Sequence, residues 1–431
     1  MGGDGSDKLP PVYLTIYAEH LRDPEILEAF RKALPEGRRC EYGVLPKAPQ
    51  PGVSAPVLAG SAALSLFNDP ETLDPLADCV AATRQAGPEY ALIVVVNPTQ
   101  LAALGRWLKR RAETTHLSGV RLLVASNVDE VMPQLAVRLG PVKGDNIIRM
   151  PMATEVENSP MRNYYVFSPQ LHDLTRRIRD FAHNGVDRAY LLGGPGSGKT
   201  TLAYYYYLCR GKGRFVTVNL SSESTGDKAA IKSLLCGHVS GAFPGAGARN
   251  GAFTTAADGV CFIDESHGLT GAVMEVLMEA LDSGQYMPYG ASSKRAVECA
   301  ILFATNRSWE HLQNAVNIDE FTRLGAAVLE VPELTKRQED LIAVVGMTLA
   351  KLAEGCTSWT KPAGVSAEAW KLISECRWHG NVRALVRVLE AGFVDAAARG
   401  NDSLLQVQDI AHGISLWEPK THHSHQIYAT V

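Results

Sequence analysis

Short runs of consecutive apolar residues alternate with stretches of helical periodicity through the first 150 residues. The apolar runs predict strands over residues 12–17, 42–45, 90–96, 120–125 and, as a last short strand, 147–150. Apolar positions spaced three and four apart predict helices over residues 23–34 and 101–113. Strands that alternate with helices over this length predict a flavodoxin-like α/β domain with a parallel sheet. We place this domain at residues 1–152 and a linker at residues 153–164.

The alternation resumes after residue 165. Apolar runs over 189–192, 260–263 and 300–304 each end in polar residues or glycine. This pattern predicts a second parallel sheet whose polar edge lies at the carboxyl ends of its strands. We expect this α/β unit to span residues 165–335, a smaller α-helical unit to span 336–415, and a tail to cover 416–431.

The first of these runs leads into a glycine-rich turn that has the pattern of a phosphate-binding P-loop. Its residues are Gly193, Gly194, Pro195, Gly196, Ser197, Gly198, Lys199 and Thr200, with Thr201 following. Glycines let backbone N–H groups wrap phosphates at a helix N-terminus, Lys199 can neutralise the β and γ oxygens, and the Thr200 hydroxyl can ligate magnesium. The turn therefore predicts a site for ATP and Mg²⁺.

Other polar residues follow the later apolar runs. Asp264 and Glu265 end the run at 260–263, and we expect Asp264 to hold Mg²⁺ through water while Glu265 orients or deprotonates the attacking water. Asn306 follows the run at 300–304 and is a candidate sensor of the γ-phosphate. Arg383 would reach the nucleotide from the helical unit. Arg323 is the candidate for an arginine supplied across a subunit interface.

A short glycine-bounded segment lies between the P-loop and the acidic pair. It comprises Gly241, Ala242, Phe243, Pro244, Gly245 and Ala246. Glycine frees the backbone, and Phe243 is a lone large apolar group among small residues. Two interpretations stay open: a mobile tip that presses on a partner, or an ordinary turn with Phe243 packed in the core.

These motifs, in this order, resemble the AAA+ domains of bacterial enhancer-binding proteins, which activate sigma-54 RNA polymerase. The resemblance covers residues 166–414. It includes 235–246, similar to the segment that ends in the family's Gly-Ala-Phe-Thr-Gly-Ala signature, 284–290, similar to the second pore loop, and 378–383, similar to sensor II. It also places Asn219 where the family carries the asparagine that couples the catalytic glutamate to the remodelling loop.

The resemblance implies a P-loop AAA+ core with a helical lid, assembly into a hexameric ring, and remodelling of the polymerase closed complex. Three positions depart from the family pattern: Pro244 replaces threonine, Asn317 replaces a second interface arginine, and Thr200 replaces a common glutamate. Proline fixes φ and removes an N–H donor at the tip that contacts sigma-54. An AAA+ ATPase that remodels a non-polymerase protein in a stress or defence system is therefore the alternative function.

The order of the N-terminal elements resembles a response-regulator receiver domain, which accepts phosphate on an aspartate at the tip of its central strand. We take residues 91–96 as that strand, and it ends in Asn97 with no acid. Only Glu19 follows the first strand, and no lysine closely follows Met150. We expect a domain that takes up no phosphate and senses a ligand or binds a protein. A domain that only scaffolds the ATPase or holds it inactive is the alternative.

Composition and charge limit the possible functions and locations of the protein. The 431 residues carry a net charge of −4, which gives no electrostatic case for bulk nucleic-acid binding. The eight cysteines occur singly and are expected to be reduced core thiols. We expect a cytoplasmic protein without a membrane segment. The residues after Ile414 are too few for a helix-turn-helix domain, so none is expected at the C-terminus.

Overall fold

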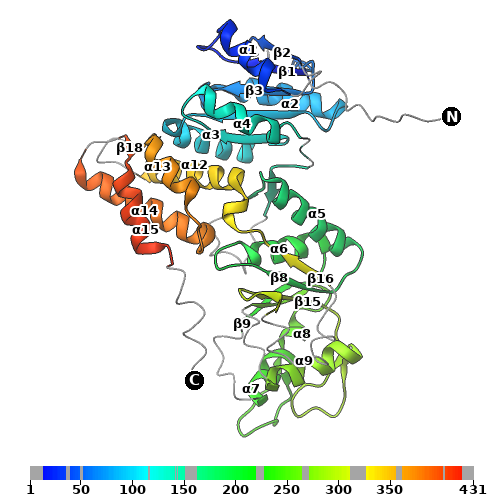
Figure 1. Cartoon of the computed structure of the whole chain (residues 1–431). Helices are drawn as coiled ribbons and strands as arrows, with labels where there is room; N and C mark the ends of the chain where they lie inside the picture. Colours follow the sequence, from blue (N-terminus) through cyan, green and yellow to red (C-terminus); the bar gives the residue numbers. More distant parts are fainter. Residues whose placement is uncertain are drawn as a thin grey trace, which may run out of the picture.

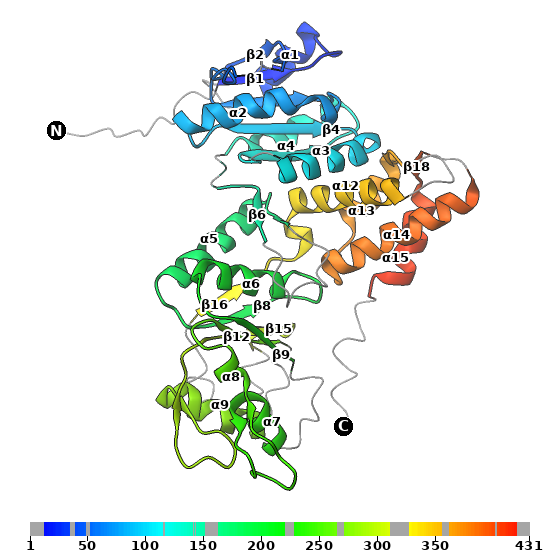
Figure 2. The same ribbon diagram turned by 180° about the vertical axis from the view of Figure 1, so that it is seen from behind.

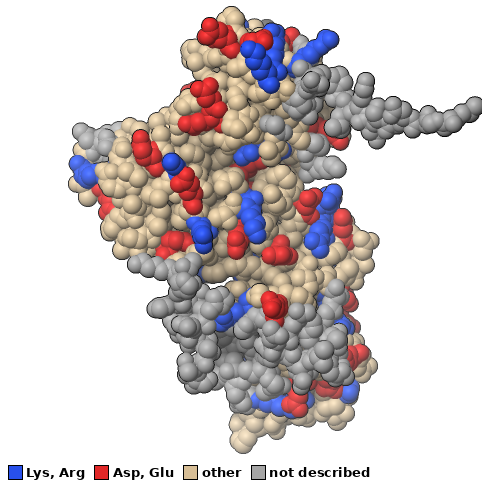
Figure 3. Space-filling view, viewed as in Figure 1, with Lys and Arg blue, Asp and Glu red and all other residues tan. Residues whose placement is uncertain are grey.

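The computed structural model describes residues 13–34, 39–48, 52–114, 117–140, 142, 144–150, 163–219, 228–264, 271–310, 327–355, 362–400 and 403–419. Two parallel sheets are separated along the length of this part of the chain, and a group of helices from the C-terminal part lies between them on one side (Figures 1 and 2). On the face drawn in Figure 3, acidic and basic side chains are interspersed. None of the helices in the described ranges is long and apolar enough to cross a membrane.

The N-terminal sheet has five parallel strands in the order β2-β1-β3-β4-β5. The strands are β1 (Tyr13–Tyr17), β2 (Arg39–Gly43), β3 (Ala62–Leu66), β4 (Ala91–Val96) and β5 (Val120–Val124). The helices are α1 (Pro24–Ala33), α2 (Asp74–Ala86), α3 (Leu101–Thr114) and α4 (Val128–Arg138), with 3-10 turns at Pro70–Thr72 and Pro98–Gln100. All residues of β3, β4 and β5 are buried, as expected of a parallel sheet covered on both faces. The prediction of an α/β N-terminal unit is confirmed.

The structure corrects two details of the predicted N-terminal sheet. The central strand is β3, which the apolar pattern missed, so the prediction that residues 91–96 form the central strand is wrong. Residues 147–149 do form a strand, β6 (Ile147–Arg149), but it pairs antiparallel with β7 (Asn163–Tyr165) outside the sheet. Residues 151–162, which include most of the expected linker, lie outside the described residues.

The second sheet is also parallel, in the order β16-β8-β15-β12-β9. Its strands are β8 (Arg188–Leu192), β9 (Phe215–Asn219), β12 (Val260–Asp264), β15 (Ala300–Thr305) and β16 (Ala327–Glu330). The helices are α5 (Pro169–His183), α6 (Lys199–Arg210), α7 (Lys228–Cys236), α8 (Ala252–Thr255) and α9 (Gly271–Ser283). Because side chains alternate along each strand, Leu191 packs in the core with α5 and α6, while Tyr190 packs in the core with α7 and α9. The expected P-loop α/β core is confirmed.

The helical unit contains α12 (Gln338–Gly355), α13 (Ala367–Glu375), α14 (Asn381–Arg399) and α15 (Val407–Trp417), preceded by a 3-10 turn at Leu334–Lys336. Two-residue strands β17 (Gly364–Val365) and β18 (Leu404–Leu405) pair with each other. Helix α15 extends two residues into the segment predicted as a tail, and residues 420–431 lie outside the described ranges.

The helical unit packs directly on the N-terminal unit, and the two share one hydrophobic core that includes Trp107 of α3 and Leu341 of α12. Helices α3 and α12 lie side by side in both views (Figures 1 and 2). They approach so closely that a Cβ atom on Gly105 would lie 2.0 Å from the carbonyl oxygen of Gly346. Only glycine permits this backbone contact.

Charged groups at the start of α12 hold the same junction. Glu339 is 3% exposed and pairs with Arg121 of β5, with 2.6 Å between Oε1 and Nη2. The next residue, Asp340, accepts a hydrogen bond from the backbone N–H of Phe167, just before α5 (2.8 Å). The first turn of α12 thus contacts both the N-terminal sheet and the entry to the P-loop core.

Candidate functional site

The glycine-rich turn lies between β8 and α6, at the carboxyl edge of the second sheet. Gly196 and Gly198 have φ of 68° and 104°, left-handed values that glycine adopts readily. The Gly193 N–H donates to the carbonyl oxygen of Thr305 (3.2 Å), which ties the turn to the end of β15. The strand-turn-helix context required of a P-loop is present.

The polar groups of the turn suit a polyphosphate. The Lys199 side chain is largely buried, and its Nζ donates to the carbonyl oxygens of Gly193 (2.8 Å) and Gly194 (3.1 Å). Ser197 Oγ is buried and makes no hydrogen bond within the described part of the protein. Thr200, in the first turn of α6, is exposed. A buried ammonium, an unused hydroxyl and a helix N-terminus fit the phosphates of ATP, and the exposed Thr200 hydroxyl fits an Mg²⁺ ligand.

The helical unit closes on this turn through Asn381. Asn381 is 1% exposed and has a left-handed φ of 49°. Its Nδ2 donates to the Pro195 carbonyl oxygen (3.1 Å), and its Oδ1 accepts from the Leu334 N–H (2.9 Å). Sequence reasoning named the surrounding motif but missed this residue as part of the site. An asparagine directly after glycine at a helix start was the available signal, because asparagine tolerates left-handed backbone.

The backbone and Cβ of Arg383 lie close to Gly196 of the P-loop. A Cβ atom on Gly196 would lie 2.7 Å from the Cβ of Arg383 and 2.6 Å from the Gly380 carbonyl oxygen. The rest of the Arg383 side chain is exposed. The structure thus brings the predicted sensor arginine beside the phosphate turn.

Three other predicted polar residues, Asn219, Asp264 and Asn306, lie at the carboxyl ends of strands of the same sheet. Asp264 ends β12 and pairs in register with Asn219 at the end of β9. Asn306 follows β15 and is exposed. Glu265 and Arg323, like Asn317, lie outside the described residues, so their roles stay predictions.

The segment at 241–246 forms a tight exposed turn. The Gly241 N–H donates to the Ala246 carbonyl oxygen (3.0 Å), and the Ala246 N–H donates to that of Phe243 (3.0 Å). Phe243 is 45% exposed, and its ring is tilted against His238, with centroids 4.9 Å apart. The exposed Phe243 excludes the interpretation in which this side chain packs in the core.

A second loop supports this turn from beside it. The turn lies between the antiparallel strands β10 (Gly237–His238) and β11 (Arg249–Asn250). The second loop lies between the antiparallel strands β13 (Gln285–Tyr286) and β14 (Arg295–Ala296). The Val239 N–H donates to the Tyr289 carbonyl oxygen (3.1 Å), and the Tyr289 N–H donates to that of Gly237 (2.8 Å). A Cβ atom on Gly290 would lie 2.9 Å from that of Ala242. The two loops therefore form one structural unit.

Comparison with protein families gives a match to the sigma-54 interaction domain over residues 165–330. The chain is 31% identical over 217 residues to the nitric oxide reductase transcription regulator NorR1 of Cupriavidus necator, covering 49% of this chain and 41% of that protein. It is 31% identical over 205 residues to the Nif-specific regulatory protein of Herbaspirillum seropedicae, covering 46% and 37%. It therefore spans less than half the length of these two relatives.

Two solved structures share the fold over nearly the whole chain. They are NtrX of Brucella abortus in complex with ADP and in complex with ATP. Each gives a TM-score of 0.50 at 17% identity, and they cover 96% and 93% of this chain and 88% and 86% of NtrX. The likeness extends through the N-terminal sheet as well as the P-loop core. Residues 165–330 thus match the sigma-54 interaction domain, and the NtrX structures share the α/β fold of the chain.

Proposed function

We propose that this protein is an ATP-hydrolysing AAA+ ring protein that remodels the sigma-54 RNA polymerase closed complex and so regulates transcription. The observation that carries the proposal is the exposed Phe243 on a turn braced by a second loop, in a core that also holds a P-loop. An aromatic side chain left half in solvent at the tip of a tight turn suits contact with a partner protein. The regulators among the relatives support the same assignment.

Residues at the carboxyl edge of the second sheet would each have a separate role in ATP binding and hydrolysis. ATP, when bound with Mg²⁺, supplies the phosphoanhydride bond that is hydrolysed. Lys199 would hold the phosphates, Thr200 and Asp264 the magnesium, and Glu265 would orient the attacking water. Arg323 would complete the site of the neighbouring subunit in a hexamer.

Asn219 would link this site to the exposed turn. It lies beside Asp264 at the end of the neighbouring strand, and β9 leads along the chain toward α7 and the hairpin that carries Phe243. A shift of Asn219 that follows the state of the phosphates would thus be transmitted toward the loop pair. Asn306, directly after β15, and Arg383, in the helical lid, would report the same state to those two elements.

We further propose that residues 1–152 form a regulatory unit that takes up no phosphate, residues 165–335 the ATPase core, and residues 336–415 its lid. The tip of the true central strand, β3, carries Asn68, which is 2% exposed. Its Nδ2 donates to the Tyr17 carbonyl oxygen (2.7 Å) and its Oδ1 accepts from the Glu19 N–H (2.9 Å). The adjacent Asp69 caps the following turn by accepting from the Glu71 N–H (3.1 Å). Both side chains thus have structural roles, and labelling of residues 1–150 by a phosphodonor would contradict this assignment.

The ATPase assignment is tested with two variants of the purified protein. Lys199→Ala removes the ammonium that neutralises the phosphates, so we expect loss of ATP binding. Glu265→Ala should keep binding and lose hydrolysis, because the carboxylate acts on water. Equilibrium binding and a steady-state phosphate-release assay measure the two effects. Equal hydrolysis rates in wild type and Glu265→Ala would refute the role of that glutamate.

A further inference from the structure

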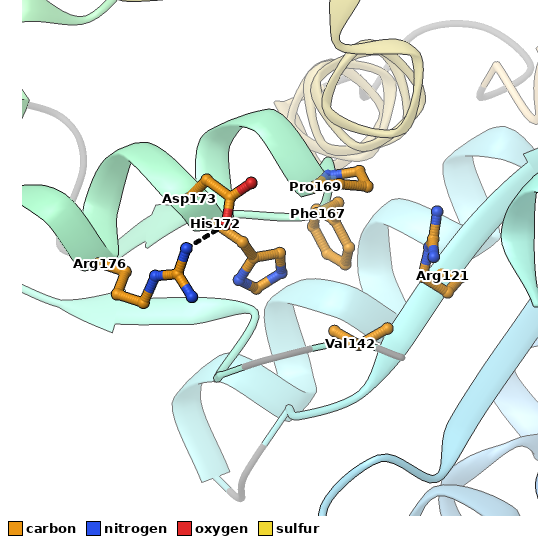
Figure 4. Close-up of a pocket in the computed structure, with 7 residues that line it drawn as sticks. All are labelled: Arg121, Val142, Phe167, Pro169, His172, Asp173 and Arg176. Atoms are coloured by element: carbon orange, nitrogen blue, oxygen red, sulfur yellow. Dashed lines mark hydrogen bonds and ion pairs between the residues drawn. The ribbon is translucent and has the colours of Figure 1, made fainter. Parts of the chain in front are cut away.

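Two neighbouring cavities lie where the N-terminal unit meets α5. One, of about 240 Å³, is lined among others by Arg121, Phe167, His172 and Arg176 (Figure 4). The other, of about 390 Å³, shares His172 and Arg176 and extends toward Arg179. These volumes approach the size range of small-molecule sites. We call the pair the junction cavities.

Arginines outnumber carboxylates in the cavity linings: Arg121, Arg176 and Arg179 face Asp145 and Asp173, and Asp173 pairs with Arg176 (2.8 Å). Arg121 and Arg138 both approach one carboxylate, Glu339, at 2.6 Å and 3.9 Å. Arg84 is partly buried, and the hydrogen bonds of its guanidinium go to neutral acceptors, Ser118 Oγ (2.9 Å) and the carbonyl oxygens of Tyr90 (2.6 Å) and Val142 (3.1 Å). One of these bonds holds the cavity wall at Val142, and Asp145 is the carboxylate whose charge acts on this guanidinium.

His172 lines both cavities, and its pKa is shifted by its burial and by the nearby charges. Burial, and then the charges of Arg121 and Arg84, lower its pKa to about 4, and the opposing effects of Asp173 and Asp145 are smaller. Its Nε2 is buried and makes no hydrogen bond within the described part of the chain. In Figure 4 the imidazole points into the space between Arg176 and Arg121. Leaving a buried polar group unpaired is costly, so a ligand that pairs with it gains that energy.

We propose that the junction cavities bind a small organic anion bearing carboxylate or phosphate groups. The anion would lie between Arg121 on β5 and the pair His172 and Arg176 on α5, accepting hydrogen bonds from each. Charge-assisted bonds of this kind are the strong ones, and arginine guanidinium is the group best shaped for carboxylate and phosphate oxygens.

Such a ligand would also affect how the N-terminal sheet, α5 and the lid pack against one another. Arg121 also holds Glu339 at the start of α12, so an anion beside Arg121 contacts the same group that ties the N-terminal sheet to the lid. Binding would therefore bridge β5 and α5, and it would place a second anion on the guanidinium that Glu339 holds. Any effect on hydrolysis rests on the proposed ATPase function, whereas the binding itself does not.

Isothermal titration of the full-length protein tests the proposal with two probes, citrate and inorganic phosphate, at constant ionic strength. ADP is present to block the P-loop, and magnesium is left out because citrate chelates it. We expect at least one probe to bind with a Kd of about 1 mM or below. Binding of citrate alone would identify a carboxylate ligand, and binding of phosphate alone a phosphate ligand.

Matched variants on one helix locate the site. Arg176→Gln and His172→Gln should each weaken binding by about tenfold, the loss of one charge-assisted or buried hydrogen bond. Arg177→Gln is the control, because Arg177 packs on Phe181 and reaches the Val328 carbonyl oxygen, away from both cavities. Equal binding by Arg176→Gln and Arg177→Gln, or no binding of either probe below about 10 mM, would overturn the proposal.

An independent readout comes from the imidazole itself. An anion beside His172 favours its protonated form, so the His172 pKa measured by NMR should rise when the bound probe is present. An unchanged His172 pKa with saturating probe would place the bound anion elsewhere and would also overturn the proposal.

Discussion

Glu339 is the residue whose neutralisation should most weaken the docking of the lid on the N-terminal unit. Its carboxylate accepts from Arg121 Nε (3.0 Å) and Nη2 (2.6 Å) and from the backbone N–H of Leu122 (3.3 Å). Glu339 and Arg121 are each 3% exposed. Glu339→Gln keeps the shape of the side chain and removes its charge, so Arg121 and Arg138 remain close together with no carboxylate between them.

The expected cost follows from burial. Removing one partner of a buried ion pair costs about 3–5 kcal/mol, because the remaining charge stays desolvated. The glutamine oxygen can still accept one hydrogen bond, so we expect the lower end, about 3 kcal/mol. Replacing both partners, as Arg121→Met with Glu339→Leu, should restore most of the loss, since an apolar pair leaves no buried charge.

Hydrogen exchange measured by mass spectrometry separates this local effect from global unfolding, which is not two-state in a chain of several units. Exchange in α3 and α12 should accelerate roughly a hundredfold in Glu339→Gln, while α6 and α9 stay unchanged. Lys109→Gln is the control, since it breaks the exposed Lys109–Glu354 pair between the same two helices and should cost under about 1 kcal/mol. If both variants change exchange equally, the buried pair does not hold the junction.

Two further changes test the site and the junction. Asn381→Gly keeps the left-handed backbone but removes the bonds to Pro195 and Leu334, so ADP affinity should fall about tenfold; an unchanged Kd would show that the lid contact does not shape the P-loop. His172 has a pKa of about 4 when folded against a reference of 6.5, so the folded state binds fewer protons in this window and loses stability as the pH falls from 6.5 toward 4. Thermal melts of His172→Gln should therefore be less sensitive to acid than those of wild type between pH 7 and 4.5, and parallel curves would contradict the assignment.

The sequence predicted those parts of the fold whose conformation is determined by residues that are consecutive in the chain. The turn at 193–200 is one such part, because its glycines, lysine and following helix specify the local conformation by themselves. Strand β3 was missed because Ala62–Leu66 is a short run of mostly small residues, which local periodicity does not distinguish from a loop or a helix segment. Once β3 was missed, the next apolar run took its place as the central strand, since strand order in a parallel sheet is not the order along the chain.

The junction between units could not be predicted, because its residues are far apart in the chain. Gly105 and Gly346 each lie inside a helix, where an isolated glycine signals only a weaker helix. The close contact between their two backbones forms only when both helices have folded and packed against each other. The same holds for Arg121 and Glu339, which are 218 positions apart and acquire their buried partnership from that crossing.

We propose that the exposed turn contacts sigma-54 when the nucleotide site is in its transition state. The direct test is binding of purified protein to sigma-54 with ADP and aluminium fluoride, compared with ADP alone and with a Phe243→Ala variant. We predict a complex that forms only with the trapped nucleotide and is lost without the Phe243 ring, despite proline at position 244. Absence of a complex from wild-type protein that still hydrolyses ATP would contradict the claim and assign the loop to a different partner.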